Sequence, residues 1–208
     1  MRRSICYCEP AFALAGELKT WKFLYTPSTN LPKGAKLKFD LHSKGREIDW
    51  QIPSTNLKKG NQLIYGLIND QKVVQANEVI VGDSFTPHYE FTLPSALAAG
   101  ETFTIVLGAK HTEIAKKNSG TIRAQTTSQR RRTFYLYVDP TGKGHYPEAD
   151  TFSMDVKGAQ LTNIRILTPS YVVKNKRFDI IVRFEDQFGN LTSLADEDTL
   201  IELSHEHL

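Results

Sequence analysis

Apolar and polar residues alternate along most of the chain. The clearest case is KLKFDL, residues 36–41, in which every second residue is apolar. This period of two is typical of β-strands that bury one face. Comparable segments cover residues 4–8, 19–25, 48–52, 62–68, 73–81, 88–93, 102–107 and 133–138. Residues 94–99 and 112–117 could each form at most one helical turn. The pattern therefore predicts an all-β protein with mainly antiparallel strands.

The phrase PSTNL precedes two of these strands, at residues 27–31 and 53–57. In both copies, two residues and a glycine follow the leucine. The same arrangement recurs from Leu97 to Gly100 and, with Asn175 in the glycine position, before residues 177–184. Glycine and asparagine tolerate the positive φ of tight turns. The turn positions are 26, 40 and 75 residues apart, and this unequal spacing predicts a strand-entry turn rather than a structural repeat.

The strongest boundary signal is DPTGKGHYPEAD, residues 139–150, which contains two glycines and two prolines. We predict an antiparallel β-sandwich, jelly-roll or immunoglobulin-like, over residues 1–145 and a linker over residues 146–150. A second, immunoglobulin-like β module follows over residues 151–208. An immunoglobulin-like sandwich needs about seven strands and about 100 residues, so we expect the second module to be incomplete at its C-terminus.

Composition excludes few functions. The 208 residues carry a net charge of +3, which does not demand an anionic partner. Cys6 and Cys8 are too close in sequence to form a disulfide readily, and we predict two reduced thiols. Glu9 and Pro10 interrupt the apolar stretch that a signal peptide needs, and no run approaches the length of a membrane span. The expected location is therefore cytoplasmic, with no membrane partner.

Three stretches, residues 28–57, 124–144 and 164–193, together resemble the N-terminal part of a family of large uncharacterised bacterial proteins, most closely its chlamydial members. The resemblance implies β-rich modules ahead of a polymerase-and-histidinol-phosphatase-like (PHP-like) domain, which is similar to metal-dependent phosphoesterases. It also implies that the metal ligands lie downstream of this chain, and that downstream domains of the same polypeptide are its partners.

Two histidine phrases could suggest a metal. PHP-type sites often begin with Asp-Leu-His-x-His, and Asp40-Leu41-His42 resembles this start, but Lys44 replaces the second histidine. His205 and His207 could share one face of a strand, yet a zinc site needs further ligands. We therefore expect no metal, cofactor or catalytic residue in this chain.

The strongest charge feature is Arg130-Arg131-Arg132, which ends a polar, aperiodic segment that we predict to be a long loop over residues 109–129. With Arg123, these arginines belong to a segment, residues 110–138, whose net charge is +6. One interpretation is contact with a phosphate or an acidic partner, and the other is a solvated loop with one structural arginine. Nucleic acid is not expected, because the RNA-recognition aromatic pattern is missing.

Five aromatic residues could stack on sugars, as in carbohydrate-binding sandwiches, or could pack in the core. They are Trp21, Trp50, Tyr65, Tyr135 and Tyr137. The sequence favours a non-catalytic binding or scaffolding region that positions or targets a downstream PHP-like domain, with a protein or glycan as a further partner. The alternatives are phosphate-gripping residues of a phosphoesterase and a carbohydrate- or nucleic-acid-binding sandwich.

Overall fold

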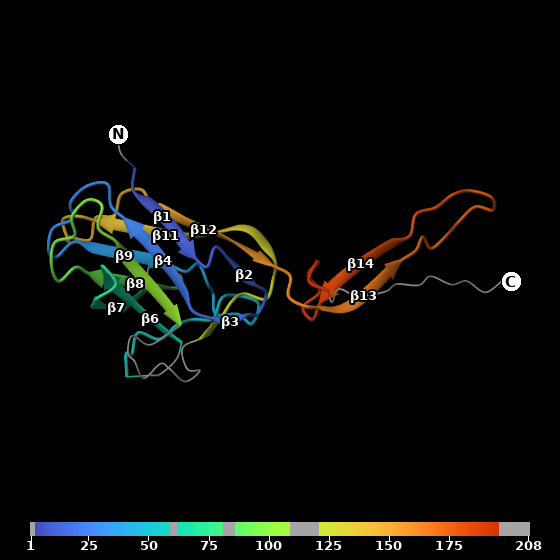
Figure 1. The fold of residues 1–208 in the computed structure, drawn as a ribbon, viewed down its shortest axis with the longest axis horizontal. Helices are drawn as coiled ribbons and strands as arrows, with labels where there is room; N and C mark the ends of the chain where they lie inside the picture. Colours follow the sequence, from blue (N-terminus) through green and yellow to red (C-terminus); the bar gives the residue numbers. More distant parts are fainter. Residues whose placement is uncertain (1–2, 59–61, 81–85, 109–120, 196–208) are drawn as a thin grey trace. The chain divides into compact units, whose positions relative to one another are not determined.

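The computed structural model describes residues 3–58, 62–80, 86–108 and 121–195. These residues form strands and no helix, as Figure 1 shows. The chain divides into two units, Met1–Lys157 and Gly158–Leu208. The strands of the first unit are β1 (Ile5–Glu9), β2 (Phe12–Leu14), β3 (Leu18–Lys19), β4 (Trp21–Thr26), β5 (Lys36–Asp40), β6 (Leu63–Ile68), β7 (Lys72–Ile80), β8 (Pro87–Thr92), β9 (Phe103–Gly108), β10 (Ile122–Arg123), β11 (Gln129–Asp139) and β12 (Asp150–Lys157).

Ten of these strands form one sheet in the order β1-β4-β9-β6-β7-β8-β5-β11-β12-β2. Strands β1 and β2 follow each other directly in sequence yet stand at opposite ends of this order, so the two edges of the sheet must approach each other. The result is a nearly closed, barrel-like sheet. The all-β prediction is confirmed. The pairs within this sheet are antiparallel except β12 with β2, which is parallel.

The core lies inside the curled sheet and is rich in aromatic rings. Phe23 packs edge-on against Phe134 and Phe152, with ring centroids 4.9 and 5.4 Å apart. Phe39, which the alternating pattern placed inside, contacts the same three rings and has no exposed surface. Strand β12 supplies Phe152 to this core and pairs with β11. The division of the chain therefore falls after Lys157 rather than at the predicted linker 146–150.

Positive φ confirms the predicted turn at three of its four positions, but a strand follows within three residues only at Gly34 and Gly100, since β14 begins at Ile181, six residues after Asn175. Gly34, Gly100 and Asn175 have φ values of +86°, +89° and +64°. The leucines ahead of the first two turns, Leu31 and Leu97, are buried and exchange two backbone hydrogen bonds of 2.8 and 2.9 Å. The two turns therefore close one end of the sheet together. The glycine of the second PSTNL copy lies outside the described residues.

One predicted strand, residues 48–52, is absent. Asp49 instead accepts hydrogen bonds from the backbone N–H groups of Lys44 and Arg46 and stabilises a turn. This turn places Trp50 in the core and leaves Ile48 46% exposed. The alternation there reflects a loop that inserts one large side chain, rather than a paired strand.

The second unit contains β13 (Leu161–Leu167) and β14 (Ile181–Asp186), which form an antiparallel hairpin. A turn over Asp186–Asn190 lies at its base. Residues 196–208, the C-terminal end of the predicted second module, lie outside the described residues. The described part of this unit is thus a single two-stranded ribbon.

Candidate functional site: a tyrosine face on the sheet

The outer face of β5, β8 and β11 gathers aromatic and ionisable side chains. Cross-strand register places Asp40 between Tyr135 and His88. In the neighbouring row, Lys38 stands between Tyr137 and Glu90. We call this surface the tyrosine face. It consists of Lys38, Asp40, His42, His88, Glu90, Tyr135, Tyr137 and Tyr146.

The rings of this face are partly exposed and lie next to one another. Tyr135 and Tyr137 are stacked with centroids 6.5 Å apart. His88 is also stacked against Tyr137 at 6.5 Å, and His42 meets Tyr135 edge-on at 6.2 Å. Both tyrosines are half-buried, so each ring keeps an accessible edge or face. The arrangement is a row of flat side chains on three paired strands.

Asp40 is the acidic centre of the face. It is 7% exposed, and its Oδ1 accepts the backbone N–H of His42 at 2.6 Å. Its Oδ2 lies 3.7 Å from both His42 Nδ1 and His88 Nε2. Burial lowers the pKa of His88, and Asp40 only partly opposes this effect. His88 is therefore neutral at neutral pH, and its Nδ1 has no hydrogen-bond partner among the described residues.

A loop after β11 adds the third tyrosine. The fully buried Asp139 carboxylate accepts hydrogen bonds from the Thr141 hydroxyl at 2.7 Å and from the backbone N–H groups of Thr141, Gly144 and His145. These bonds hold the pKa of Asp139 at about 2, although burial alone would raise it. The predicted boundary segment is thus a tightly held loop that presents Tyr146.

Tyr146 reaches back over β5 and β8. Its hydroxyl donates to Glu90 Oε2. Burial and this bond raise the pKa of Tyr146 well above its ordinary value. Lys38 Nζ lies 4.0 Å from the ring centroid of Tyr146 and 5.2 Å from that of Tyr137. Glu90 also pairs with Lys36 at 3.0 Å. On this side of the face, the negative charge of Glu90 is therefore balanced by neighbouring lysines.

The arginines singled out from the sequence do not form one cluster. Arg132 donates through one nitrogen to the carbonyl oxygens of Leu41 and His42, at 3.0 and 2.8 Å. Its guanidinium stands 5.3 Å from the ring centroid of Phe134. This half-buried side chain thus tethers the segment after β5 to β11. Burial lowers its pKa.

Arg130 and Arg131 are exposed at a β-bulge. Arg131 has a φ of +50°, and its backbone N–H donates to Asp155 Oδ1 at 2.8 Å. The regular alternation of side chains along β11 therefore breaks at this point. Arg123 belongs to β10, in a separate two-stranded sheet with β3.

The predicted aromatic ligand surface needs correction at both tryptophans. Trp21 and Trp50 are fully buried and pack edge-on at 4.9 Å. Tyr65 is 3% exposed and packs in a second apolar cluster with Leu63 and Val106. Because rings without accessible surface cannot stack on a ligand, these three residues are structural. Only Tyr135 and Tyr137 of the set lie on an accessible face.

The described residues show no group of three or more His, Cys, Asp or Glu side chains that could hold a metal ion. His42 has a φ of +52° and lies two residues after the end of β5. His205 and His207 lie outside the described residues. Cys6 and Cys8 are free thiols, as predicted, and burial raises the pKa of each to about 12.

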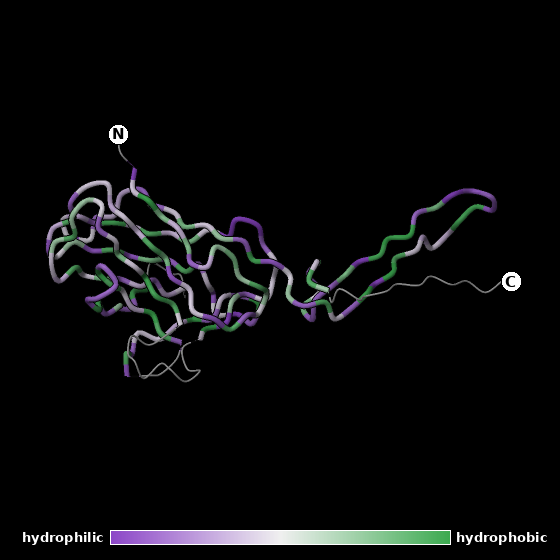
Figure 2. Tube along the Cα trace, in the orientation of Figure 1, coloured by the Kyte–Doolittle hydropathy of each residue, from purple (hydrophilic) through white to green (hydrophobic). Residues whose placement is uncertain are grey.

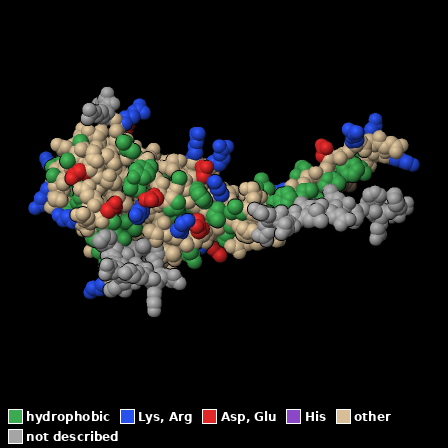
Figure 3. Space-filling view, viewed as in Figure 1, with side chains coloured by type: hydrophobic (Ala, Val, Ile, Leu, Met, Phe, Trp, Pro, Cys, Tyr) green, Lys and Arg blue, Asp and Glu red, His purple; other side chains and the backbone are tan. Residues whose placement is uncertain are grey.

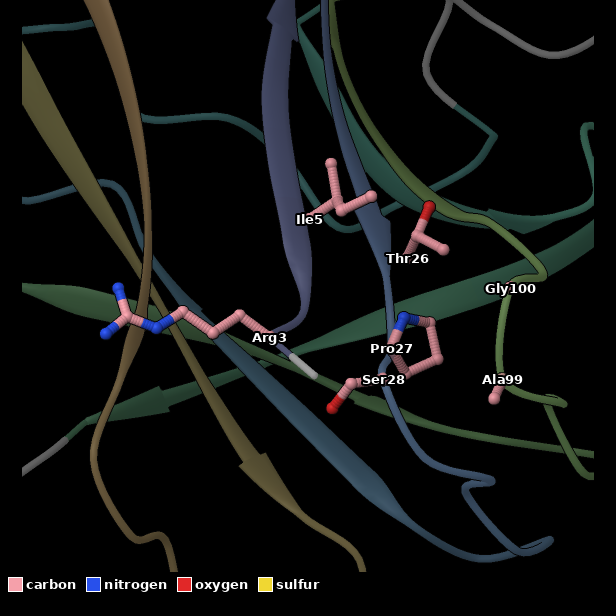
Figure 4. Close-up of a pocket in the computed structure, with 7 residues that line it drawn as sticks. All are labelled: Arg3, Ile5, Thr26, Pro27, Ser28, Ala99 and Gly100. Carbon is pink, nitrogen blue, oxygen red and sulfur yellow. The ribbon is translucent and has the colours of Figure 1, made fainter. Parts of the chain in front are cut away.

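A shallow hollow beside the first PSTNL turn is a weaker candidate. It lies between the start of β1, residues 26–28 and the turn at Gly100. Figure 4 shows that the Arg3 guanidinium points away from the other lining side chains. The hollow therefore brings no set of polar groups together. No helix long and apolar enough to cross a membrane occurs in the part of the chain described.

Sequence reasoning missed half of the tyrosine face. Tyr135 and Tyr137 were visible as the outward positions of an alternating strand. His88, Glu90 and Tyr146 were not, because their place beside these tyrosines depends on strand order and on the Asp139 loop. The available signal was the Asp139-Pro140-Thr141-Gly142 phrase, which is typical of a side-chain-capped turn.

These observations define the chain as an all-β protein with a nearly closed, barrel-like sheet. It is similar to uncharacterised chlamydial proteins. Identity is 52% over 210 residues with a protein of Chlamydia pneumoniae, and 51% over 208 residues with proteins of Chlamydia muridarum and Chlamydia trachomatis. Each match covers 100% of this chain, but the chain spans only 33% of the length of each relative. The chlamydial part of the resemblance is confirmed, while the PHP-like domain stays a prediction.

No protein-family model matches the sequence. One similar solved structure is AvmM, which catalyses macrocyclization in alchivemycin A biosynthesis. The likeness covers 77% of this chain and 90% of that chain, with a TM-score of 0.34 and 11% identity. A likeness this weak carries no argument on function.

Proposed function

We propose that this chain is a non-catalytic binding or scaffolding region of a longer protein, and that its ligand surface is the tyrosine face. One observation carries the proposal: two tyrosines and two histidines lie around a nearly buried carboxylate, and a third tyrosine covers the neighbouring Lys38 and Glu90. A binding surface of this kind needs partly exposed rings for contact area and a few fixed polar groups for orientation.

A neutral glycan is the ligand class that this face fits best. Sugar rings offer C–H faces to Tyr135 and Tyr137, and sugar hydroxyls can donate to the Asp40 carboxylate. The neutral His88 ring adds a group that can either donate or accept. Glu90 is paired with Lys36 and stands opposite Lys38 in the register, so this side of the face carries no excess of negative charge, and among the described residues it offers no free cluster of cations for a phosphate.

The alternative in which Arg130 to Arg132 grip a phosphate has less support. Arg132 already donates hydrogen bonds to the carbonyl oxygens of Leu41 and His42. If it turned to a phosphate, these two carbonyl groups would lose their donor. A phosphate would then depend on the exposed side chains of Arg130 and Arg131 alone.

In the whole protein, the proposed role is to position or target a downstream PHP-like hydrolase domain. The relatives support a longer protein, because about two thirds of their length lies outside the region that matches this chain. The test compares phosphoesterase activity, with added divalent metal, in these 208 residues and in the full-length polypeptide. We expect activity only in the full-length polypeptide, and hydrolysis by the 208 residues alone would refute the accessory role.

Ligand binding is tested by calorimetry with a panel of neutral oligosaccharides. Tyr137→Ala should weaken binding about tenfold, or about 1.4 kcal/mol, because it removes the ring at the centre of the row. Tyr7→Ala is the matched control, since Tyr7 is a 50% exposed tyrosine on β1. Equal effects of the two substitutions would place the binding surface elsewhere.

A further inference from the structure

The β13–β14 hairpin has one apolar face, and an opposite face, here called the charged face, that carries Arg165, Arg183 and Glu185 and ends in Leu167 and Ile181. Register pairs Ile164 with Phe184 and Ile166 with Val182, and these four side chains share a face. Ile164 and Ile166 remain 43% and 47% exposed. Apolar surface of this kind on a regular element is typical of an interface. Figure 3 shows hydrophobic side chains along the hairpin.

The opposite face satisfies its own charges. Arg183 Nε lies 3.1 Å from one Glu185 oxygen, and Arg165 Nε lies 3.7 Å from the other. Glu185 is 3% exposed although it lies on a two-stranded ribbon, because both arginines and the following chain cover it. The charged face is therefore suited to solvent, and the apolar face is the one that needs a partner.

The base of the hairpin is held in a defined geometry. The fully buried Asp186 carboxylate accepts backbone N–H groups of Ala159, Phe188 and Asn190, at 2.8, 2.9 and 2.9 Å. These bonds lower the pKa of Asp186. The bond from Ala159, just before β13, to Asp186, at the end of β14, ties the two strands together at the base of the hairpin.

The segment between β13 and β14 carries further exposed apolar side chains, namely Tyr171, Val172, Val173, Phe178 and Ile180. In Figure 2 the hydrophobic stretches follow both arms of the hairpin. A two-stranded hairpin is at best marginally stable in water, and stability requires further strands or a packed face.

We propose that further β-strands of the same polypeptide, from the part of the longer protein outside these 208 residues, pack on this apolar face and complete a β-sandwich. The relatives are about three times as long as the match, so ample chain exists to supply those strands. Covalent linkage gives such strands an effective concentration in the millimolar range, which favours them over a second copy or a separate protein.

The experiment is hydrogen exchange of residues 161–167 and 181–186 in the 208-residue chain and in the full-length natural polypeptide that carries it. We expect exchange at least about 100-fold slower in the full-length polypeptide, because packing raises the free energy of local opening. Ile166→Asp in the full-length polypeptide should restore fast exchange. Ile181→Asp makes the same chemical change on the charged face and should not.

Two results would overturn the proposal. Equally fast exchange in both proteins would mean that the rest of the polypeptide does not cover the hairpin. Protection that appears in the 208-residue chain and grows with its concentration, together with a dimer in sedimentation, would assign the face to a second copy. The experiment contains no sugar, so neither result bears on ligand binding at the tyrosine face, and the two proposals can fail independently.

Discussion

Replacing Asp139 with Asn should destabilise the first unit by about 2 kcal/mol at neutral pH. The structure gives Asp139 a pKa of about 2 against an ordinary 3.8, and a difference of this size corresponds to about 2.4 kcal/mol of stability. Asn keeps one acceptor oxygen for Thr141. Its NH₂ group, however, would face the N–H groups of Gly144 and His145, which would lose their acceptor.

The sign of the pH dependence follows from the lowered pKa. The folded chain binds the proton less tightly than the unfolded chain, so the stabilisation is fully present above about pH 3.8. It is lost as the pH falls towards about 2. The difference between wild type and Asp139→Asn should therefore shrink towards zero over that window.

Urea unfolding followed by tryptophan fluorescence measures this difference. Both tryptophans, Trp21 and Trp50, lie in the core of the first unit, so the signal reports on that unit alone. Glu148→Gln is the control, because Glu148 is an exposed carboxylate near the same loop. A loss below about 0.5 kcal/mol at pH 7, or a loss that does not change with pH, would refute the assigned role of Asp139.

Three further predictions follow from particular contacts. Because the pKa of His88 is lowered in the folded chain, its contribution to the free energy of unfolding should be fully present above about pH 6.5 and should fall as the pH drops through the folded-state pKa. In urea unfolding, His88→Gln should therefore lose less stability than wild type between pH 7 and pH 5.5, and an equal loss would contradict this role. Gly142→Ala should cost more than Gly144→Ala in thermal unfolding, by about 1 kcal/mol or more. Both glycines have positive φ, but only a Cβ at position 142 would collide with the Gly34 carbonyl oxygen, and equal losses would argue against that contact. Cys8, with a pKa of about 12, should react with iodoacetamide at pH 8 far more slowly in the folded chain than in urea, and equal rates would contradict its burial.

The alternating pattern predicted the strands of the first unit well, because each buries one face against a common core. The failures have physical causes. Residues 48–52 alternate like a strand, but Asp49 stabilises a turn in their middle. Strand β12 was assigned to the second unit because the Pro and Gly residues before it are typical of a linker, whereas here they build the Asp139 loop.

The candidate site was less predictable than the fold. Tyr135 and Tyr137 could be named from one strand alone. Asp40 and His88 join them only because β5 lies between β8 and β11, an order that local sequence does not encode. Arg131 could not be placed from the sequence either. It has a positive φ at a β-bulge that breaks the alternation, although arginine is not a residue type that favours this conformation.

The most direct test of the proposed ligand surface is amide chemical-shift mapping during titration of the 208-residue chain with neutral oligosaccharides. We predict saturable shifts confined to β5, β8, β11 and residues 139–146, which vanish in Tyr137→Ala. Saturable shifts that map instead to β1 and β4, or persist unchanged in Tyr137→Ala, would contradict the assignment of the tyrosine face as the binding surface.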